Sequence, residues 1–246
     1  MKKMRLWLPL MACVWLLTAC KIELNGVGNK IEPSKNIVKN EYKMPAFDEM
    51  DVDVVANVKF VQSSGETKVV LSCPDNYVEL FRFEVEKGNE LEVGFVRDNV
   101  NIDPQHVDIT VYAPSLKKLD NSGVASVEVD RLTGDRLEVE NSGVGGVYLS
   151  GLQFSDIEAE CSGVGSIEIG GMANHANLEC SGVGSIKAGQ LKAKSVKAEV
   201  SGVGGIDCYA SESIEGEVSG VGSLKFAGKP QNKQLNRSGI GDISEI

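Results

Sequence analysis

The chain has 246 residues with 35 acidic and 25 basic side chains, which gives a formal net charge of -10 at pH 7. This charge argues against a general affinity for nucleic acid or for anionic membranes. Nucleic acid is therefore not expected as a partner, and no basic patch is expected on the surface.

Residues 1–19 have the layout of a lipoprotein signal peptide. The basic start MKKMR precedes the apolar stretch LWLPLMACVWLLTA, which is too short to span a bilayer comfortably. Residues 17–20, LTAC, resemble the lipobox of bacterial lipoproteins, in which the chain is cut before the cysteine and the thiol receives a lipid. We expect a cell-envelope protein held in the outer membrane by lipid at Cys20, on its periplasmic or its surface face. An ordinary signal peptide with a chance cysteine is the alternative.

Residues 20–40 show little hydrophobic periodicity and contain Asn, Lys, Gly and Pro. This composition predicts a flexible tether between the lipidated cysteine and the folded part of the chain. Beyond the tether, four cysteines remain in an exported and potentially oxidising compartment, and their spacing is not that of metal ligands. They are Cys73, Cys161, Cys180 and Cys208.

The tetrapeptide S-G-V-G and its close variants recur along the second half of the chain. Successive motif serines are 20, 20, 19, 20, 18 and 19 residues apart, which indicates a solenoid. The serines are Ser122, Ser142, Ser162, Ser181, Ser201, Ser219 and Ser238. Stretches such as SVEV and SIEI follow the motif, and stretches such as RLEVEN and DIEAEC precede it. Their period of two predicts two short strands per repeat, with S-G-V-G at one corner and a looser turn at the other.

Three columns of apolar residues are expected to form the core of this solenoid. The column five residues after the serine contains Val127, Val147, Ile167, Ile186, Ile206, Leu224 and Ile243. The column two residues after it contains Val124, Val144, Val164, Val183, Val203, Val221 and Ile240. The column five residues before it contains Leu137, Ile157, Ala176, Val196 and Ile214.

The first glycine of each motif is interpreted as a structural turn residue, because glycine adopts a positive φ at little cost. These glycines are Gly123, Gly143, Gly163, Gly182, Gly202, Gly220 and Gly239. A nucleotide-binding glycine loop needs a single loop between a strand and a helix. Seven loops between strands exclude that interpretation.

Residues 41–119 alternate in the same way but lack the motif. We expect this N-terminal β region to begin and cap the stack, and residues 120–246 to form the repeat solenoid. A separate small β domain is the alternative for the N-terminal region.

The stretch VDITVYAPSLKKLDNSGVASVEV, residues 107–129, and the later S-G-V-G copies resemble a family of exported bacterial proteins. This family is the "putative auto-transporter adhesin, head GIN domain" family, and the resemblance covers about residues 45–246. It implies an all-β, right-handed parallel β-helix (β-solenoid) with a pectin-lyase-like shape. It also implies a role in adhesion and no catalytic set.

The two histidines, His106 and His175, fall in stretches that look like loops, away from any recognisable nucleophile. This distribution argues against a hydrolase built from Ser or Cys with His. No catalytic residue and no metal ligand is therefore assigned.

One glutamate stands two residues before most motif serines and forms the candidate binding surface. These residues are Glu140, Glu160, Glu179, Glu199 and Glu217. Stacked coils would place them in a ladder of like charges, with a second outward column beside it made of Glu138, Glu158, Asn177, Lys197 and Glu215. Three interpretations stay open: a solvated acidic face, a surface for Ca²⁺ or a cationic partner, or a catalytic pair of carboxylates within the ladder. Apart from Ca²⁺ on this ladder, no cofactor is expected.

The sequence as a whole predicts a non-enzymatic, lipid-anchored envelope protein that binds a cell-surface glycan or protein. A carbohydrate-active enzyme on the same scaffold and a purely structural envelope protein are the alternatives. Cys161 and Cys180 occupy the same column on neighbouring coils. They are expected to be small apolar side chains of the core, and a disulfide between them is the alternative. Weak self-association is expected through the open edge of the last coil.

Overall fold

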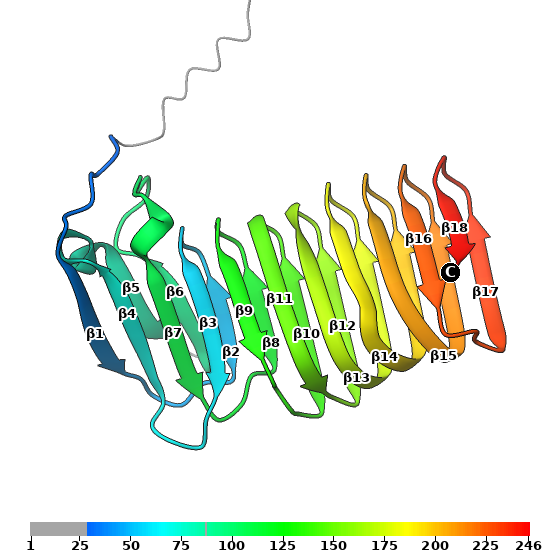
Figure 1. Ribbon diagram of the computed structural model, residues 1–246, viewed down its shortest axis with the longest axis horizontal. Helices are drawn as coiled ribbons and strands as arrows, with labels where there is room; N and C mark the ends of the chain where they lie inside the picture. Colours follow the sequence, from blue (N-terminus) through cyan, green and yellow to red (C-terminus); the bar gives the residue numbers. More distant parts are fainter. Residues whose placement is uncertain (1–28, 87) are drawn as a thin grey trace, which may run out of the picture.

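The computed structural model describes residues 29–86 and 88–246, so the signal peptide and Cys20 lie outside the described residues. The fold is nearly all β, with 63% strand, and forms a solenoid of about six turns. Parallel bridges join positions about 20 residues apart. The predicted β-solenoid is therefore confirmed, and Figure 1 shows its coils stacked along the long axis of the molecule.

Two parallel sheets run along the stack, and each coil contributes to both. Face A carries the residues before each S-G-V-G corner and consists, in spatial order, of β6 (Glu90–Phe95), β2 (Glu49–Val52), β8 (Lys118–Asn121), β10 (Arg136–Asn141), β12 (Asp156–Cys161), the second halves of β13 (Val164–Cys180), β14 (Ser185–Val200) and β15 (Gly205–Val218), and β17 (Asn232–Arg237).

Face B carries the residues after the corner and lies opposite face A. It consists of β7 (Asp108–Ala113), β3 (Asn57–Gln62), β9 (Ser126–Asp130), β11 (Val144–Gln153), the first halves of β13, β14 and β15, β16 (Ser223–Ala227) and β18 (Asp242–Glu245).

The core is the thin layer of side chains between the two faces. Two of the three columns predicted to be core are buried there, the ones five residues before and five residues after the motif serine, with Ile243 partly buried. Successive side chains of a strand point to opposite sides, so the alternate residues of each strand face away from the core. Burial of one apolar row per coil against its neighbours is what holds a repeat fold of this kind together.

The third column, two residues after the serine, was predicted to be core, and this prediction is wrong. Its six valines are 50–58% exposed and Ile240 is 87% exposed. The alternation of a strand holds only while the chain is extended. At the corner the chain bends between the two faces, and the valine side chain points outward.

The corner opposite S-G-V-G also differs from the prediction of a looser turn. In β13, β14 and β15 the parallel ladder continues across this corner, and β13 alone runs for 17 residues. Here β-structure continues through the bend rather than giving way to a separate turn.

The order of coils at the N-terminal end does not follow the chain. The coil of β2 and β3 lies between the coil of β6 and β7 and the coil of β8 and β9, although residues 90–113 come later in the chain than residues 49–62. The parallel stack therefore begins upstream of the first S-G motif. At this end β4 (Lys68–Pro74) pairs antiparallel with β1 (Ile37–Lys43) and with β7, and β5 (Phe81–Val85) pairs antiparallel with β6.

Residues 31–40 belong to this end of the fold and are not a free tether, which corrects the prediction for residues 20–40. Ile31 forms an isolated bridge with Ile102, and the Tyr77 hydroxyl donates a hydrogen bond to the Ile31 carbonyl at 2.6 Å. Tyr77 is the buried residue of the short 3₁₀ helix η1 (Asp75–Leu80). These contacts hold a segment whose polar composition alone suggested a linker.

Glycine is required at the corners for a reason other than the predicted positive φ. None of the seven first glycines has a positive φ. A Cβ atom at any of them would instead overlap backbone of the preceding coil, which from Gly143 onward is a glycine carbonyl and the serine beside it. The coils approach each other so closely at this corner that no side chain fits between them.

The cysteines of the described residues are free and buried, which favours the prediction of small filler over that of a disulfide. Cys161 and Cys180 are register partners on neighbouring coils. The Cys180 thiol and burial raise the pKa of the Cys161 thiol, so this thiol stays protonated.

Replacement of Gly182 by Ala tests the close approach at the corner. The added Cβ would overlap the backbone of Ser162 and Gly163, and we expect the free energy of unfolding to fall by more than about 2 kcal/mol. The matched control is Gly189→Ala in β14, farther along the same coil, where nothing lies within 4 Å of an added Cβ. Denaturant unfolding should show a change of less than about 0.5 kcal/mol for the control. Equal stability of the two variants would contradict the proposed packing role.

Candidate functional site

The predicted ladder of glutamates exists as a row on face A. Register pairs join Glu140 to Glu160, Glu160 to Glu179, Glu179 to Glu199 and Glu199 to Glu217. The row also continues upstream through Asp120, Asp51 and Glu92. Sequence reasoning missed Asp51 and Glu92 because they precede the first motif. It missed Asp120, which lies two residues before Ser122, because the column was defined by its glutamates.

The carboxylates of this acidic ladder raise one another's proton affinity. Burial, then the charges of Glu140 and Asp51, raise the pKa of Asp120 to about 6. Burial, then Glu179 and Glu140, likewise raise the pKa of Glu160. The Oδ1 atom of Asp120 is buried and has no hydrogen-bond partner among the described residues. Close stacking of like charges is therefore a cost that the fold carries along face A.

A calcium site on the ladder is not preformed. Within residues 29–86 and 88–246, no group of three or more His, Cys, Asp or Glu side chains is placed to hold a metal ion. Adjacent coils bring carboxylates together in a line rather than around a point, whereas Ca²⁺ takes six to eight oxygen ligands.

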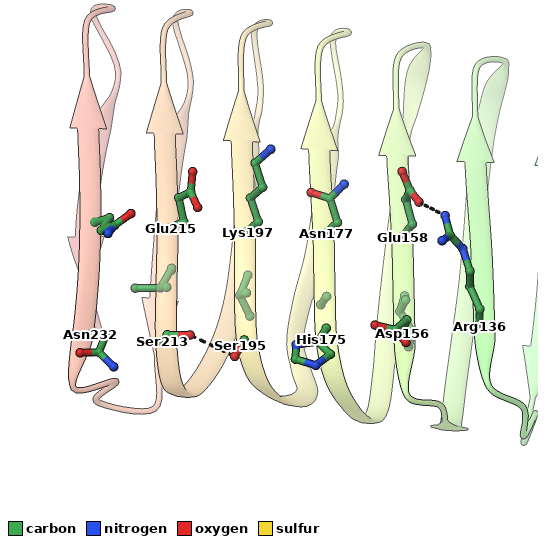
Figure 2. Close-up of a pocket in the computed structure, with 15 residues that line it drawn as sticks. Arg136, Asp156, Glu158, His175, Asn177, Ser195, Lys197, Ser213, Glu215 and Asn232 are labelled. Atoms are coloured by element: carbon green, nitrogen blue, oxygen red, sulfur yellow. Dashed lines mark hydrogen bonds and ion pairs between the residues drawn. The ribbon is translucent and has the colours of Figure 1, made fainter.

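A groove of about 510 Å³ lies on face A beside the acidic ladder. Two rows of outward side chains form its walls, and the outward row nearer the far corner contains Arg136, Asp156, His175, Ser195, Ser213 and Asn232. The second row passes through Glu158, Asn177, Lys197, Glu215 and Gln234. Figure 2 shows that both rows project from the same side of the sheet, with one residue of each row per coil.

The second outward column of the prediction is therefore mostly a wall of this groove, and the first row is new. Every member of the first row lies six residues before a motif serine, so the motif spacing could have identified it. Both rows contain unlike side chains, in contrast to the uniform acidic ladder next to them.

Two direct contacts order the groove. The Arg136 guanidinium donates to the Glu158 carboxylate at 2.6 Å, across the two coils that start the groove. Farther along, the Ser213 hydroxyl donates to the Ser195 hydroxyl at 3.0 Å. The remaining hydroxyl, amide and imidazole groups of the two rows offer both donors and acceptors to a ligand.

His175 lies on β13 and not in a loop, which corrects the prediction for this residue. Its register partners are Asp156 on one side and Ser195 on the other, in the order of a Ser-His-Asp triad. Within the described part of the chain, no hydrogen bond joins His175 to either neighbour. Ser195 instead shares its hydrogen bond with Ser213. A nucleophile and its base are recognised by such a bond, so Asp156, His175 and Ser195 form a polar row and not an assembled triad.

His106 stands apart from this groove. It ends the 3₁₀ helix η2 (Pro104–His106) near the N-terminal end of the stack and is exposed.

In the described part of the chain, no helix is long and apolar enough to cross a membrane.

The fold defines the class of protein, a β-solenoid repeat protein with continuous polar rows along one sheet. Residues 46–230 match the family described as "putative auto-transporter adhesin, head GIN domain". The chain belongs to this family, whose adhesin-like character implies a cell-surface or cell-envelope protein with an adhesive, non-catalytic role.

Solved structures of similar proteins agree with this assignment. A protein named "putative adhesin" from Bacteroides fragilis is 36% identical, with a TM-score of 0.83 over 88% of this chain and 100% of its own. A "putative lipid binding protein" from Parabacteroides distasonis, at 20% identity, has a TM-score of 0.71 over 89% of this chain and 100% of its own. The second shares the fold alone. Among curated proteins, no relative matches the chain.

The raised pKa of Asp120 predicts that the contribution of this residue to stability increases as the pH falls from about 7 to about 4. The folded protein holds this proton more tightly than the unfolded chain, so lowering the pH through about 6 favours the folded state. Asp120→Asn should raise the free energy of unfolding at pH 7.5 by about 1 kcal/mol, a value reduced for solvent screening, and flatten the pH dependence.

The control for this prediction is Asp207→Asn, which removes one exposed carboxylate from face B. Thermal unfolding between pH 4.5 and 7.5 should leave its pH dependence parallel to that of the parent protein. An Asp120→Asn variant whose pH dependence is parallel to that of the parent would contradict the prediction.

Proposed function

We propose that this chain is a non-catalytic adhesion module of the cell envelope that binds an extended glycan along the groove of face A. The observation that carries this proposal is the pair of unlike polar rows in the groove. Coils repeat about every 4.8 Å, and an extended polysaccharide repeats on a similar length, so successive sugar units can meet successive coils.

The charges of the groove favour a neutral glycan over a strongly charged one. Arg136 and Lys197 are balanced within the groove by acidic groups, which include Asp156 and Glu215. Arg136 is already paired with Glu158. The acidic ladder alongside would repel a polyanion, so hydroxyl groups are the ligand chemistry that fits these donors and acceptors best.

The acidic ladder has two roles in this proposal that an experiment can separate. It is either the solvated edge of the glycan site or the contact surface for a cationic protein, with or without Ca²⁺. The linear arrangement of the ladder supports the first role, since no three carboxylates of the described residues are placed to hold a metal ion.

An array of glycans and matrix proteins, probed with and without Ca²⁺, tests the proposal. The groove variant His175→Ala/Asn177→Ala should reduce binding to a neutral glycan at least 10-fold, because it removes two groove side chains of β13. The ladder variant Glu160→Gln/Glu179→Gln/Glu199→Gln should change it less than 3-fold. Lys192→Ala/Lys194→Ala, at exposed positions outside the groove, is the matched control.

Binding that is lost only in the ladder variant would move the site to the acidic ladder. Binding that is unchanged in both variants would contradict the groove proposal.

Cleavage of the glycan is the second candidate function, and one observation favours it. Asp156 and Glu158 both face the groove from β12, and their Cα atoms are two residues, or about 6.6 Å, apart. Only Glu158 is paired with Arg136. Two carboxylates in unlike surroundings are the arrangement that glycoside hydrolysis uses. Release of reducing ends from a bound glycan in the same array would establish this function in place of simple adhesion.

We also propose that lipid at Cys20 anchors the protein, on the basis of the LTAC sequence that ends the signal peptide. Cys20→Ser should abolish incorporation of labelled palmitate and release the protein from the membrane fraction. Cys73→Ser, which changes a cysteine in the core, should leave the label in place. Membrane association that survives Cys20→Ser would contradict a lipid anchor.

A further inference from the structure

The outward column of the S-G-V-G corners forms a continuous aliphatic row, here called the corner ridge. It contains Val124, Val144, Val164, Val183, Val203, Val221 and Ile240. From Val144 onward, each backbone N–H of the ridge donates to the first motif glycine of the preceding coil at 2.9–3.1 Å. The ridge is therefore held in register by the backbone, and it follows the row of corners along one long edge of the molecule in Figure 1.

The ridge is apolar without contributing to the core. At 50–58% exposure, its valines leave roughly half of their surface in water, and Ile240 leaves 87%. Together the seven side chains present about 600 Å² of apolar surface in one strip, which is at the upper end of what monomeric proteins expose. Single exposed hydrophobic residues are ordinary, but an unbroken aliphatic row marks an interaction surface.

We propose that the corner ridge binds the corner ridge of a second copy of this chain. Two ridges would bury about 1,200 Å² in total, which is above the roughly 1,000 Å² that a specific interface needs. Each ridge repeats its side chains at the coil spacing of about 4.8 Å, and a second copy presents the same repeat. All seven contacts can then form at once.

The two copies run antiparallel about a two-fold axis at Val183, the central member of the ridge. Val183 then faces its own counterpart, Val144 faces Val221, and Val124 faces Ile240. This orientation places the most exposed member of each ridge against the opposite end of the partner's ridge.

The N-terminal end of the ridge is shaped to receive such a side chain. A hollow of about 730 Å³ lies there, bordered by Val124, Val144 and Val164 on one side and by residues 94–100 on the other. In an antiparallel dimer the Ile240 end of each copy enters the hollow of the other, so this contact forms twice. Arg97 in the hollow then meets the acidic residue Asp242, which follows the last corner.

Charge sets the strength of this association. An antiparallel pair places both acidic ladders on the same side of the contact, so they repel each other across the interface. Salt screens this repulsion. The dimer should therefore tighten as ionic strength rises, whereas an interface held mainly by ion pairs would weaken.

Sedimentation velocity on residues 29–246 measures the association, and the crystallised relative that is 36% identical matches 88% of this chain over the whole of its own. We expect a monomer–dimer equilibrium whose dimer fraction rises between 50 and 500 mM NaCl. Val164→Ser/Val183→Ser/Val203→Ser should lower the dimer fraction at least 10-fold. Tyr148→Ser/Met172→Ser removes two exposed apolar side chains away from the ridge and should leave the fraction unchanged. A parent protein that remains monomeric at millimolar concentration, or a dimer insensitive to the three ridge changes, would overturn the proposal.

Cysteine cross-linking tests the orientation. Val183→Cys should form a disulfide-linked dimer under mild oxidation, because this position meets itself at the two-fold axis. Val144→Cys is the matched control on the same ridge and should not cross-link alone, but it should do so when combined with Val221→Cys. Efficient cross-linking of Val144→Cys alone would overturn the antiparallel arrangement.

Flotation with lipid vesicles tests whether the corner ridge binds lipid in place of a second copy. If the monomeric protein floats with phosphatidylcholine vesicles, and the three ridge changes abolish flotation, the ridge binds lipid and the assignment to a second copy is overturned. Absence of flotation together with a ridge-dependent dimer supports the second copy.

Discussion

The close backbone contact between S-G-V-G corners is the interaction on which the rest of this structure depends. Each corner donates its N–H groups to carbonyls of the coil before it, at a separation that no side chain could enter. This contact fixes the register of every coil, because a shift by one residue would bring a side chain into the gap and turn the core row to solvent. The rows of face A and the corner ridge are consequences of that single register.

Fixed register has an electrostatic cost where the same charged residue recurs. Side chains at equivalent positions must lie over one another, whether or not their charges agree. The acidic ladder shows the result, in half-buried carboxylates and in the unpaired oxygen of Asp120. The groove beside it avoids this cost because its residues vary from coil to coil. Arg136 on one coil, for example, forms an ion pair with Glu158 on the next.

Much of the fold and part of the site could be predicted from the sequence, because strand alternation and a fixed period are local patterns. They placed Ile157 inside and Glu160 outside, and they aligned the glutamates correctly. They failed at Val164, since alternation does not apply where the chain bends. They also missed Asp51 and Glu92, whose neighbours across the sheet depend on a coil order that runs against the chain. His175 looked like a loop residue because the continuous strand across the far corner leaves no local signal.

The limited contacts of each coil in the repeat region also bear on how such proteins can diverge. Most of these coils bond to the coil before and the coil after, so one repeat unit could be duplicated or lost without disturbing the antiparallel strands at the N-terminal end. Each such event would lengthen or shorten the groove and the corner ridge together, by one sugar-sized step and one aliphatic side chain. Ligand length and self-recognition would then evolve in whole-number increments, and two chains with different numbers of coils would match each other less well than two identical ones.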